Sequence, residues 1–300
     1  MFSGQGSQRV NMARDMFVAF PAMRRLLTKH KEYEKILFPY SAFDEETRKE
    51  QEKVITDTQN AQPLLGIVDF AFAEFLKSLG VVPDMVAGHS YGELPALCFA
   101  GAFDAEELVP LSRKRALSIL DAIEEDKGKM IAVSLSETEI IALLDGEKDV
   151  WAVNLNSPKQ IVLAGSTEGI NSFMRKLSNK NIAYKELNVA CAFHSPLLHK
   201  SRDLYGDVLQ KVDFKTLRLP VWSNTTAEPY PIETQEIKNR LAEHLIKPVH
   251  FTRQVENMYN EGTRIFIEVG PGRVLTGLVQ SILGDKVSAF ETENKSFNGV

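Results

Sequence analysis

Length, composition and charge limit what this chain can be. Its 300 residues, 44% of them hydrophobic and 25% charged, are typical of a folded globular protein with one large domain or two lobes. The net charge of −5, without any basic cluster, argues against a nucleic-acid partner.

The sequence carries no sign of export or membrane insertion. No apolar stretch is long enough to cross a bilayer, and the start MFSGQGSQRV lacks the apolar core of a signal peptide. The two cysteines, Cys98 and Cys191, make neither a disulfide framework nor a metal site. We therefore expect a cytoplasmic protein with reduced thiols and no membrane partner.

The first predicted elements in chain order are two helices. Residues 44–53, DEETRKEQEK, are charged on every side and predict a solvated helix or a solvated excursion of the chain. Residues 61–80, AQPLLGIVDFAFAEFLKSLG, place apolar side chains at helical spacing, and Gly80 is expected to end this helix.

A serine between two glycines comes next. The short apolar run DMVAG, residues 84–88, predicts a strand, and a helical pattern follows the sequence GHSYG. A G-x-S-x-G pattern arises by chance in about one chain in ten of this size, so its context has to decide. A strand, a tight turn and a helix are the context of a nucleophile elbow, in which small residues let the strand and helix approach while Ser90 is exposed.

Residues 128–195 predict a separate unit. Strand and helix patterns follow in the order β-α-β-β-α-β, which is typical of a ferredoxin-like fold, and Pro158 suits the second position of the turn in the central hairpin. From residue 196 onward, the sequence again predicts alternating helices and strands like those before residue 128. We therefore predict an α/β fold with a large, α/β-hydrolase-like subdomain (1–127 and 196–300) that carries the elbow, and an inserted small subdomain (128–195). The cleft between them is the expected ligand site.

A serine hydroxyl needs a base to become a nucleophile, and histidine is the usual one. The chain has six histidines: His30, His89, His194, His199, His244 and His250. His89 adjoins the serine, and neighbours on a sharp turn point apart, so we expect it to be structural. His194, in CAFHSPLL, lies where the chain returns to the large subdomain and can overhang the elbow. It is the candidate base, with a packed or solvated histidine as the alternative.

Two glycine-rich loops raise the possibility of a nucleotide site. Neither FSGQGSQ nor EVGPGRVLTG has the Gly-Lys-Ser/Thr ending of a phosphate-binding loop, and the first lacks the third glycine of dinucleotide spacing. A nucleotide is therefore disfavoured. The exposed N–H groups of the first loop can instead hold a developing oxyanion, and the second loop indicates a tight strand-to-helix turn.

Six motifs occur in order over nearly the whole chain: GQGSQ, TQNAQPLL, GHSYGE, NSPKQIVLAG, AFHS and EVGPGRVLTGL. In order and approximate spacing they resemble the malonyl-CoA:acyl carrier protein transacylases, and most of all the acyltransferase domains of polyketide and polyunsaturated-fatty-acid synthases. That family also has a ferredoxin-like unit inserted into a larger α/β unit, in agreement with the element order above.

The resemblance implies acyl transfer through a serine ester. Ser90 would attack the thioester of an acyl-CoA, and His194 would take the serine proton and later protonate the leaving thiolate. The histidine would be oriented by a backbone carbonyl, for which the matching position is His250. The backbone N–H groups of Gln5 and Tyr91 would form the oxyanion hole.

The resemblance also implies how the acyl group is selected. Arg115 lies 115 − 90 = 25 positions after the serine, where the family has an arginine that pairs with the free carboxylate of malonyl. A guanidinium offers a carboxylate two parallel hydrogen bonds, so acetyl should be rejected. Alone, SRKRA would indicate a solvated helix face, which we retain for Arg113 and Lys114. Gln62 would line the same pocket, and Phe193 would crowd an α-methyl group and favour malonyl over methylmalonyl.

We therefore predict an acyltransferase with no bound cofactor and no metal. Its substrate would be malonyl-CoA, its acceptor the phosphopantetheine thiol of an acyl carrier protein, and its role polyketide or fatty-acid biosynthesis. Neighbouring synthase domains are further candidate partners. The alternatives are a serine thioesterase or acyl hydrolase that releases free acid, an acyltransferase for methylmalonyl or acetyl, and a docking domain that only retains the fold.

Three features depart from the family pattern. Cys191 replaces a histidine often found two residues before the phenylalanine, which weakens the argument for malonyl. Tyr91 is larger than the usual aliphatic residue, and we expect its ring to line the pocket mouth. Only Met1, Phe2 and Ser3 precede GQGSQ, where the family has an apolar strand. We expect this short segment to leave a neighbouring strand unpaired and to reduce stability.

Overall fold

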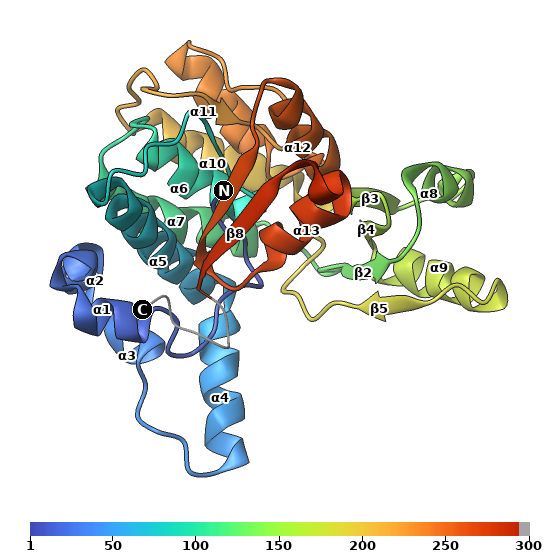
Figure 1. Ribbon diagram of the computed structural model, residues 1–300. Helices are drawn as coiled ribbons and strands as arrows, with labels where there is room; N and C mark the ends of the chain where they lie inside the picture. The colour runs from blue at the N-terminus through green and yellow to red at the C-terminus, as the bar shows by residue number, and fades with distance from the viewer. Residues whose placement is uncertain (294–300) are drawn as a thin grey trace.

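The computed structural model describes residues 1–293 as a mixed α/β structure with two groups of strands (Figure 1). Residues 294–300, which the predicted large subdomain includes, lie outside the described residues. Every helix within residues 1–293 is too short or too polar to span a membrane.

The first group contains the parallel strands β1 (Val86–Ala87), β6 (Val221–Trp222), β7 (Ile265–Pro271) and β8 (Ser288–Glu293). Strand β1 pairs with β6, and β7 pairs with β8. Phe2 joins the two pairs, because it bridges Gly88 after β1 and Val269 in β7, in both cases in the parallel direction. The spatial order is therefore β6, β1, Phe2, β7 and β8.

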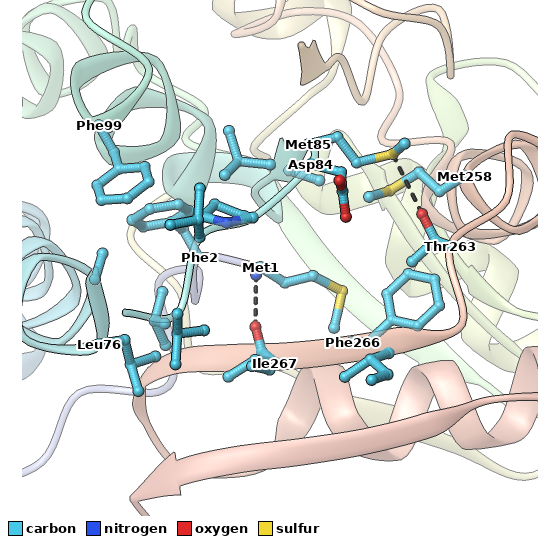
Figure 2. A pocket seen from close by; sticks show the side chains of 18 of the residues that line it. Met1, Phe2, Leu76, Asp84, Met85, Phe99, Met258, Thr263, Phe266 and Ile267 are labelled. Atoms are coloured by element: carbon cyan, nitrogen blue, oxygen red, sulfur yellow. Dashed lines mark hydrogen bonds between the residues drawn. The ribbon is translucent and has the colours of Figure 1, made fainter. Parts of the chain in front are cut away.

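Met1 and Phe2 thus take the central place among the parallel strands. The Phe2 N–H donates to the carbonyl of Ala87 (2.8 Å), and the Met1 carbonyl accepts from the Val269 N–H (2.8 Å). The Met1 amino group donates to the carbonyl of Ile267 at 2.6 Å (Figure 2). The expectation that this short segment leaves its neighbours unpaired is wrong at these positions, since two residues are enough to bridge both sides.

A pocket of about 730 Å³ lies beside Met1 and is lined by residues of β1 and β7 (Figure 2). Many of its lining side chains are apolar, among them Leu76, Met85 and Phe266. The described residues that line it do not include Ser90 or His194, so this pocket is separate from the candidate site described below.

Helices cover the parallel strands on two sides, and each side has its own apolar core. The helices in this part of the chain are α1 (Arg14–Ala19), α2 (Arg25–Lys29), α3 (Glu34–Leu37), α4 (Glu45–Thr56), α5 (Thr58–Ser78), α6 (Glu93–Phe99), α7 (Ala105–Asp121), α10 (His199–Gln210), α11 (Thr234–Glu243), α12 (Phe251–Asn260) and α13 (Val274–Leu283), of which α4 packs on other helices. Val86 and Val221 belong to the larger core, with α5, α6 and α7, whereas Ala87 and Trp222 belong to the core with α12 and α13. This division follows from the alternation of side chains along a strand.

The two helices predicted before the elbow are confirmed. Helix α4 covers most of the charged segment, and Asp44 caps its start by accepting a hydrogen bond from the Thr47 N–H (2.6 Å). Helix α5 is buried along most of its length, which its apolar composition predicts. It is followed by Gly80 with a φ of +87°, a left-handed conformation that glycine adopts without strain.

The second group of strands forms a unit with its own core, which projects from the rest of the chain (Figure 1). Its elements are β2 (Lys129–Val133), α8 (Glu137–Leu144), β3 (Val150–Ser157), β4 (Gln160–Gly165), α9 (Thr167–Asn179) and β5 (Tyr184–Glu186). The strands are antiparallel in the order β3-β4-β2-β5. The predicted hairpin is confirmed, since Ser157 pairs with Gln160 and Pro158 lies in the turn between them.

Strand β3 hydrogen-bonds this antiparallel unit to the segment at the start of α12, which belongs to the part of the molecule with the parallel strands. The Leu155 N–H donates to the carbonyl of Val249 (2.9 Å), and the Val249 N–H donates to the carbonyl of Val153 (2.8 Å). Thr252 in α12 adds a side-chain hydrogen bond to the Leu155 carbonyl (3.0 Å). These bonds fix one unit against the other close to the candidate site.

The close approach at the elbow predicts a contrast between two glycine variants. A Cβ on Gly88 would lie 2.0 Å from the carbonyl carbon of Gly92, whereas a Cβ on Gly277 in α13 meets no described heavy atom within 4 Å. Gly88→Ala should lower the free energy of unfolding by about 3 kcal/mol because rigid backbone must move. Gly277→Ala should raise it by about 0.5 kcal/mol, since alanine favours helix. Urea unfolding of both variants checks this, and equal midpoints would contradict it.

Candidate active site

Ser90 lies on a sharp turn between a parallel strand and a helix. Strand β1 ends at Ala87, and a short 3-10 segment, Ser90–Gly92, leads directly into α6. Ser90 has a φ of 51°, a left-handed value that is strained for a residue with a side chain. A Cβ on Gly92 would lie 2.3 Å from the carbonyl oxygen of Phe2, so the second glycine is required by close packing. These features match the predicted elbow.

The structure brings His194 to this serine over a sequence separation of 104 residues. The distance between Ser90 Oγ and His194 Nε2 is 2.6 Å, a short hydrogen bond. His194 is 4% exposed and also has a left-handed φ, of 59°. It lies in the loop that follows the antiparallel unit, where the sequence analysis expects the base.

The second ring nitrogen of His194 is held by a backbone carbonyl. His194 Nδ1 lies 2.9 Å from the carbonyl oxygen of His244. The prediction of His250 for this role is wrong. The His250 carbonyl accepts from the Gln254 N–H (2.9 Å) in the first turn of α12 and is already paired, whereas His244 directly follows α11, where helix carbonyls lack intrahelical partners.

This arrangement fixes the protonation of the imidazole. A carbonyl can only accept, so Nδ1 carries the proton and Nε2 offers its lone pair to the serine O–H. Burial, together with the positive charge of Arg115, lowers the pKa of His194 to about 3. The imidazole is therefore a neutral base throughout the physiological range.

His89, the histidine next to the nucleophile, has a different environment. Its Nε2 lies 2.7 Å from Asn156 Oδ1, and its ring packs edge-on against Phe251 with centroids 5.2 Å apart. Burial lowers the pKa of His89. These contacts agree with the structural role expected for it.

Arg115 is a buried cation on α7, whereas Arg113 and Lys114 on the same helix are exposed, as expected. The Arg115 side chain is 3% exposed, and within residues 1–293 it makes neither a hydrogen bond nor an ion pair. Its guanidinium carbon lies 5.8 Å from the ring centroid of Tyr91, a cation–π contact. A buried guanidinium without a carboxylate partner is costly, so the site favours an anionic ligand group there.

Gln5 and Gln62, predicted for different roles, lie together. Gln62 Nε2 donates to Gln5 Oε1 (3.2 Å), and Gln5 Nε2 donates to Thr58 Oγ1 (3.1 Å). Gln62 is buried, and its Oε1 has no hydrogen-bond partner in the described chain. Gln62 Oε1 is therefore a buried acceptor that remains available beside Gln5.

Tyr91 does not lie where it is expected. Its side chain is 1% exposed, and its hydroxyl forms a hydrogen bond with Ser112 Oγ at 2.6 Å. The ring is thus part of the core and contacts Arg115, so the prediction that it lines a pocket mouth is wrong. Gly66 makes room for it, because a Cβ there would lie 2.4 Å from the tyrosine hydroxyl.

Phe193, which directly precedes the candidate base, is partly buried between two cores. It packs against the large core of the parallel strands and against a small cluster that contains Met130 and Val153 of the antiparallel unit. Cys191, two residues earlier, is fully buried. Phe193 therefore marks the junction at which the two units meet.

Behind the elbow lies a polar cluster that the sequence motifs do not predict. Asn224 Oδ1 accepts from the Ser90 N–H (2.6 Å), and the Asn224 N–H donates to Glu93 Oε1. Glu93 Oε2 also accepts from the Tyr230 hydroxyl (2.5 Å). A glutamate at the start of an apolar helix, ELPALCF, is the signal that could have pointed to this cluster. Within residues 1–293 no group of three or more histidine, cysteine or acidic side chains is placed to hold a metal ion.

Comparisons with known proteins agree with this geometry. Residues 1–293 match the acyl transferase domain family. The malonyl CoA-acyl carrier protein transacylase of Bacillus subtilis is 33% identical over 289 residues, which cover 94% of this chain and 89% of that protein. A polyunsaturated fatty acid synthase polypeptide from Thraustochytrium is 32% identical over 306 residues, which cover 96% of this chain but only 11% of that protein.

Solved structures give the same result. The crystal structure of malonyl CoA-acyl carrier protein transacylase from Clostridium perfringens has a TM-score of 0.88 and 27% identity, and covers 98% of this chain and 92% of that one. A malonyl-transacylase in complex with the acyl carrier protein of a type II polyketide synthase has a TM-score of 0.86 and 27% identity. That match covers 97% of this chain and 94% of that one.

The depressed pKa of His194 predicts an unusual pH dependence. Because only a neutral imidazole can accept a proton from the Ser90 hydroxyl, and the pKa of His194 is about 3, a neutral sulfonyl fluoride should modify Ser90 at nearly constant rate between about pH 8 and about pH 5. Arg115→Gln removes a cause of the depression and should move the acid limb to higher pH. Intact mass spectrometry follows both reactions. A midpoint near 6.5 in the parent protein, the ordinary value for histidine, would contradict this.

Proposed function

Because this chain belongs to the acyl transferase domain family, we propose that Ser90 and His194 transfer malonyl groups from coenzyme A to an acyl carrier protein. The observation that carries this proposal is the 2.6 Å contact between Ser90 Oγ and an imidazole whose other nitrogen is fixed by the His244 carbonyl. The protein is an acyltransferase of the malonyl-CoA:acyl carrier protein transacylase type, acting in fatty-acid or polyketide biosynthesis.

The first half of the reaction forms an ester. His194 Nε2 takes the Ser90 hydroxyl proton while Oγ attacks the thioester carbonyl of malonyl-CoA. The tetrahedral intermediate then collapses, its C–S bond breaks, and the imidazolium returns the proton to the coenzyme A thiolate. The products of this half-reaction are malonyl-Ser90 and free coenzyme A.

The second half repeats these steps with a different thiol. The phosphopantetheine thiol of the carrier protein gives its proton to His194 Nε2 and attacks the malonyl ester. The C–O bond breaks, Ser90 recovers the proton, and a malonyl thioester remains on the carrier. No cofactor takes part, because each step is a proton transfer coupled to acyl exchange.

Backbone N–H groups stabilise the intermediate. We assign the oxyanion hole to the N–H groups of Gln5 and Tyr91, the second of which follows the nucleophile as elbow geometry requires. Each such donor is worth about 3 kcal/mol in the transition state. The Gln62–Gln5 hydrogen bond (3.2 Å) supports this role, since it holds the Gln5 loop against α5.

Selection of malonyl is assigned to the buried cation. Arg115 pairs with the free carboxylate, and Gln62, whose Oε1 has no hydrogen-bond partner in the described chain, lines the same pocket. Burial lowers the pKa of Arg115, and the raised electrostatic cost of its charge is relieved when a carboxylate binds. Phe193, at the junction of the two units, limits branching at the α-carbon and disfavours methylmalonyl.

We further propose the subdomain assignment made from the sequence. Within the described part of that assignment, residues 1–127 and 196–293 form the α/β-hydrolase-like subdomain with the elbow, and residues 128–195 form the ferredoxin-like one. The β-α-β-β-α-β order with the strand order β3-β4-β2-β5 supports this assignment. We place the enzyme in the cytoplasm, where free thiols such as Cys98 and Cys191 persist. Neighbouring synthase domains are candidate partners, since the chain corresponds to 11% of one synthase polypeptide.

Labelled malonyl-CoA distinguishes acyl transfer from hydrolysis. With a holo acyl carrier protein, the label should move to the carrier, and without a carrier it should stay on the enzyme. Ser90→Ala should reduce carrier labelling at least about 1,000-fold because the nucleophile is lost. Ser178→Ala, on the exposed face of α9, is the matched control and should label normally. Free malonate as the main product would favour the serine hydrolase, and labelling by Ser90→Ala would contradict the proposal.

Arg115→Ala should change the choice of acyl group. Loss of a buried partner for the carboxylate should lower kcat/KM for malonyl-CoA by about 100-fold, with a smaller effect on acetyl-CoA. Arg113→Ala, an exposed arginine on the same helix, should leave both values unchanged. Intact mass after exposure to mixed acyl-CoAs measures the ratio. Equal loading of malonyl, methylmalonyl and acetyl by the parent enzyme would refute the role assigned to Arg115.

A further inference from the structure

The amide side chain of Asn224 is bonded directly to the backbone of the elbow. Its Oδ1 accepts from the Ser90 N–H (2.6 Å), and its Nδ2 donates to the carbonyl of Gly88 (2.7 Å) and to Gln254 Oε1 (2.6 Å). Asn224 and Gln254 are both 0% exposed. Asn224 follows β6, and the carboxyl ends of parallel strands β6 and β1 meet at one edge, so this residue faces the strained serine.

Glu93 holds Asn224 from the other end of the elbow. Its carboxylate accepts from the Asn224 N–H and from the Tyr230 hydroxyl (2.5 Å), and the side chain is fully buried. Glu93 is the first residue of α6 and comes three residues after the nucleophile. One carboxylate therefore connects the elbow helix to the loop after β6.

The cluster of Asn224 and Glu93 also contacts His244, the residue whose carbonyl orients His194. His244 Nδ1 lies 3.3 Å from Glu93 Oε2, and the carbonyl of His244 is the group that holds His194 Nδ1. The two imidazole rings are 5.1 Å apart at their centroids. The Asn224 carbonyl also accepts from the His250 N–H (2.9 Å), at the end of the segment that begins at His244.

We propose that Asn224 and Glu93 are positioning residues that set the distance and direction of the Ser90–His194 hydrogen bond. Asn224 fixes the backbone of the nucleophile, and Glu93 packs against His244, the residue whose carbonyl orients the base, with 3.3 Å between Glu93 Oε2 and His244 Nδ1. This inference rests on the proposed roles of Ser90 and His194. A displacement of about 1 Å between reacting groups can reduce a rate by about 100-fold, so small movements of this cluster have a large effect.

For the positioning role of Glu93, we expect its hydrogen bonds to matter more than its negative charge. Burial raises the pKa of Glu93 to about 7, against the opposing effects of its hydrogen bonds from Tyr230 and Asn224 and of the positive charges of Arg115 and Arg240; His244 also lies against its carboxylate. A neutral glutamine of the same shape keeps an acceptor for the backbone N–H at this position. Its amide can also donate to His244 Nδ1, which has no hydrogen-bond partner in the described chain. Glu93→Gln should therefore preserve the function of this residue, whereas Glu93→Ala should lose it.

The test compares Asn224→Ala, Glu93→Ala and Glu93→Gln with a control, Asn257→Ala. Asn257, in α12, also donates its amide to a carbonyl, that of Ala227 (2.9 Å), without contact to the elbow. The first readout is the rate at which a neutral sulfonyl fluoride modifies Ser90, which needs no acyl donor. The second is kcat and KM for malonyl transfer, measured below the thermal midpoint of each variant.

Asn224→Ala should lower the sulfonylation rate and kcat by about 100-fold with KM changed less than about twofold. Glu93→Ala should lower both rates at least about 10-fold, and Glu93→Gln should restore them to within about threefold. If Asn224→Ala does not fold, the two Glu93 variants decide. Folded Asn224→Ala with rates equal to Asn257→Ala, or Glu93→Gln as slow as Glu93→Ala, would overturn the inference. A parent enzyme that reacts with the sulfonyl fluoride but not with malonyl-CoA would instead refute the proposed function.

Discussion

The hydrogen bond between Ser90 Oγ and His194 Nε2 is the interaction on which the site depends. Both residues have left-handed backbone conformations, with φ values of 51° and 59°, which residues with side chains rarely adopt. Such conformations persist only where the surrounding structure holds them. Here a glycine-packed turn holds the serine, and the carbonyl of His244 at 2.9 Å holds the imidazole. The surrounding fold thus holds Ser90 and His194 in these two backbone conformations.

Burial gives the site its electrostatic character. A carbonyl, not a carboxylate, holds His194 Nδ1, so among the described residues the imidazolium of the proposed reaction would have no negative partner at this nitrogen. Arg115 is also buried, without a hydrogen bond or an ion pair to any described residue, and its charge lowers the pKa of His194. In the proposed reaction, a substrate carboxylate that pairs with Arg115 would therefore have two effects. It lowers the electrostatic free energy of the buried Arg115 cation, and by neutralising that charge it makes protonation of His194 less costly.

Much of the fold could be predicted from the sequence because local patterns determine it. The elbow follows from a short apolar run and two glycines, and the hairpin at Pro158 follows from its turn chemistry. The support of the base could not be predicted, because the carbonyl of a residue at a helix end has no side-chain signature. His250 was the residue expected there, and only the boundaries of α11 and α12 show why His244 takes the role. The Asn224–Glu93 contact joins residues 131 positions apart, which no local pattern reports.

The most direct test of this account is the protonation state of the His194 imidazole in solution. Nitrogen-15 NMR of histidine-labelled protein, assigned with a His194→Gln variant, distinguishes a protonated from an unprotonated ring nitrogen. We expect a neutral ring with the proton on Nδ1 and a bare Nε2, unchanged between about pH 8 and about pH 5. A ring that carries its proton on Nε2, or that titrates near pH 6.5 as an ordinary histidine does, would contradict the account.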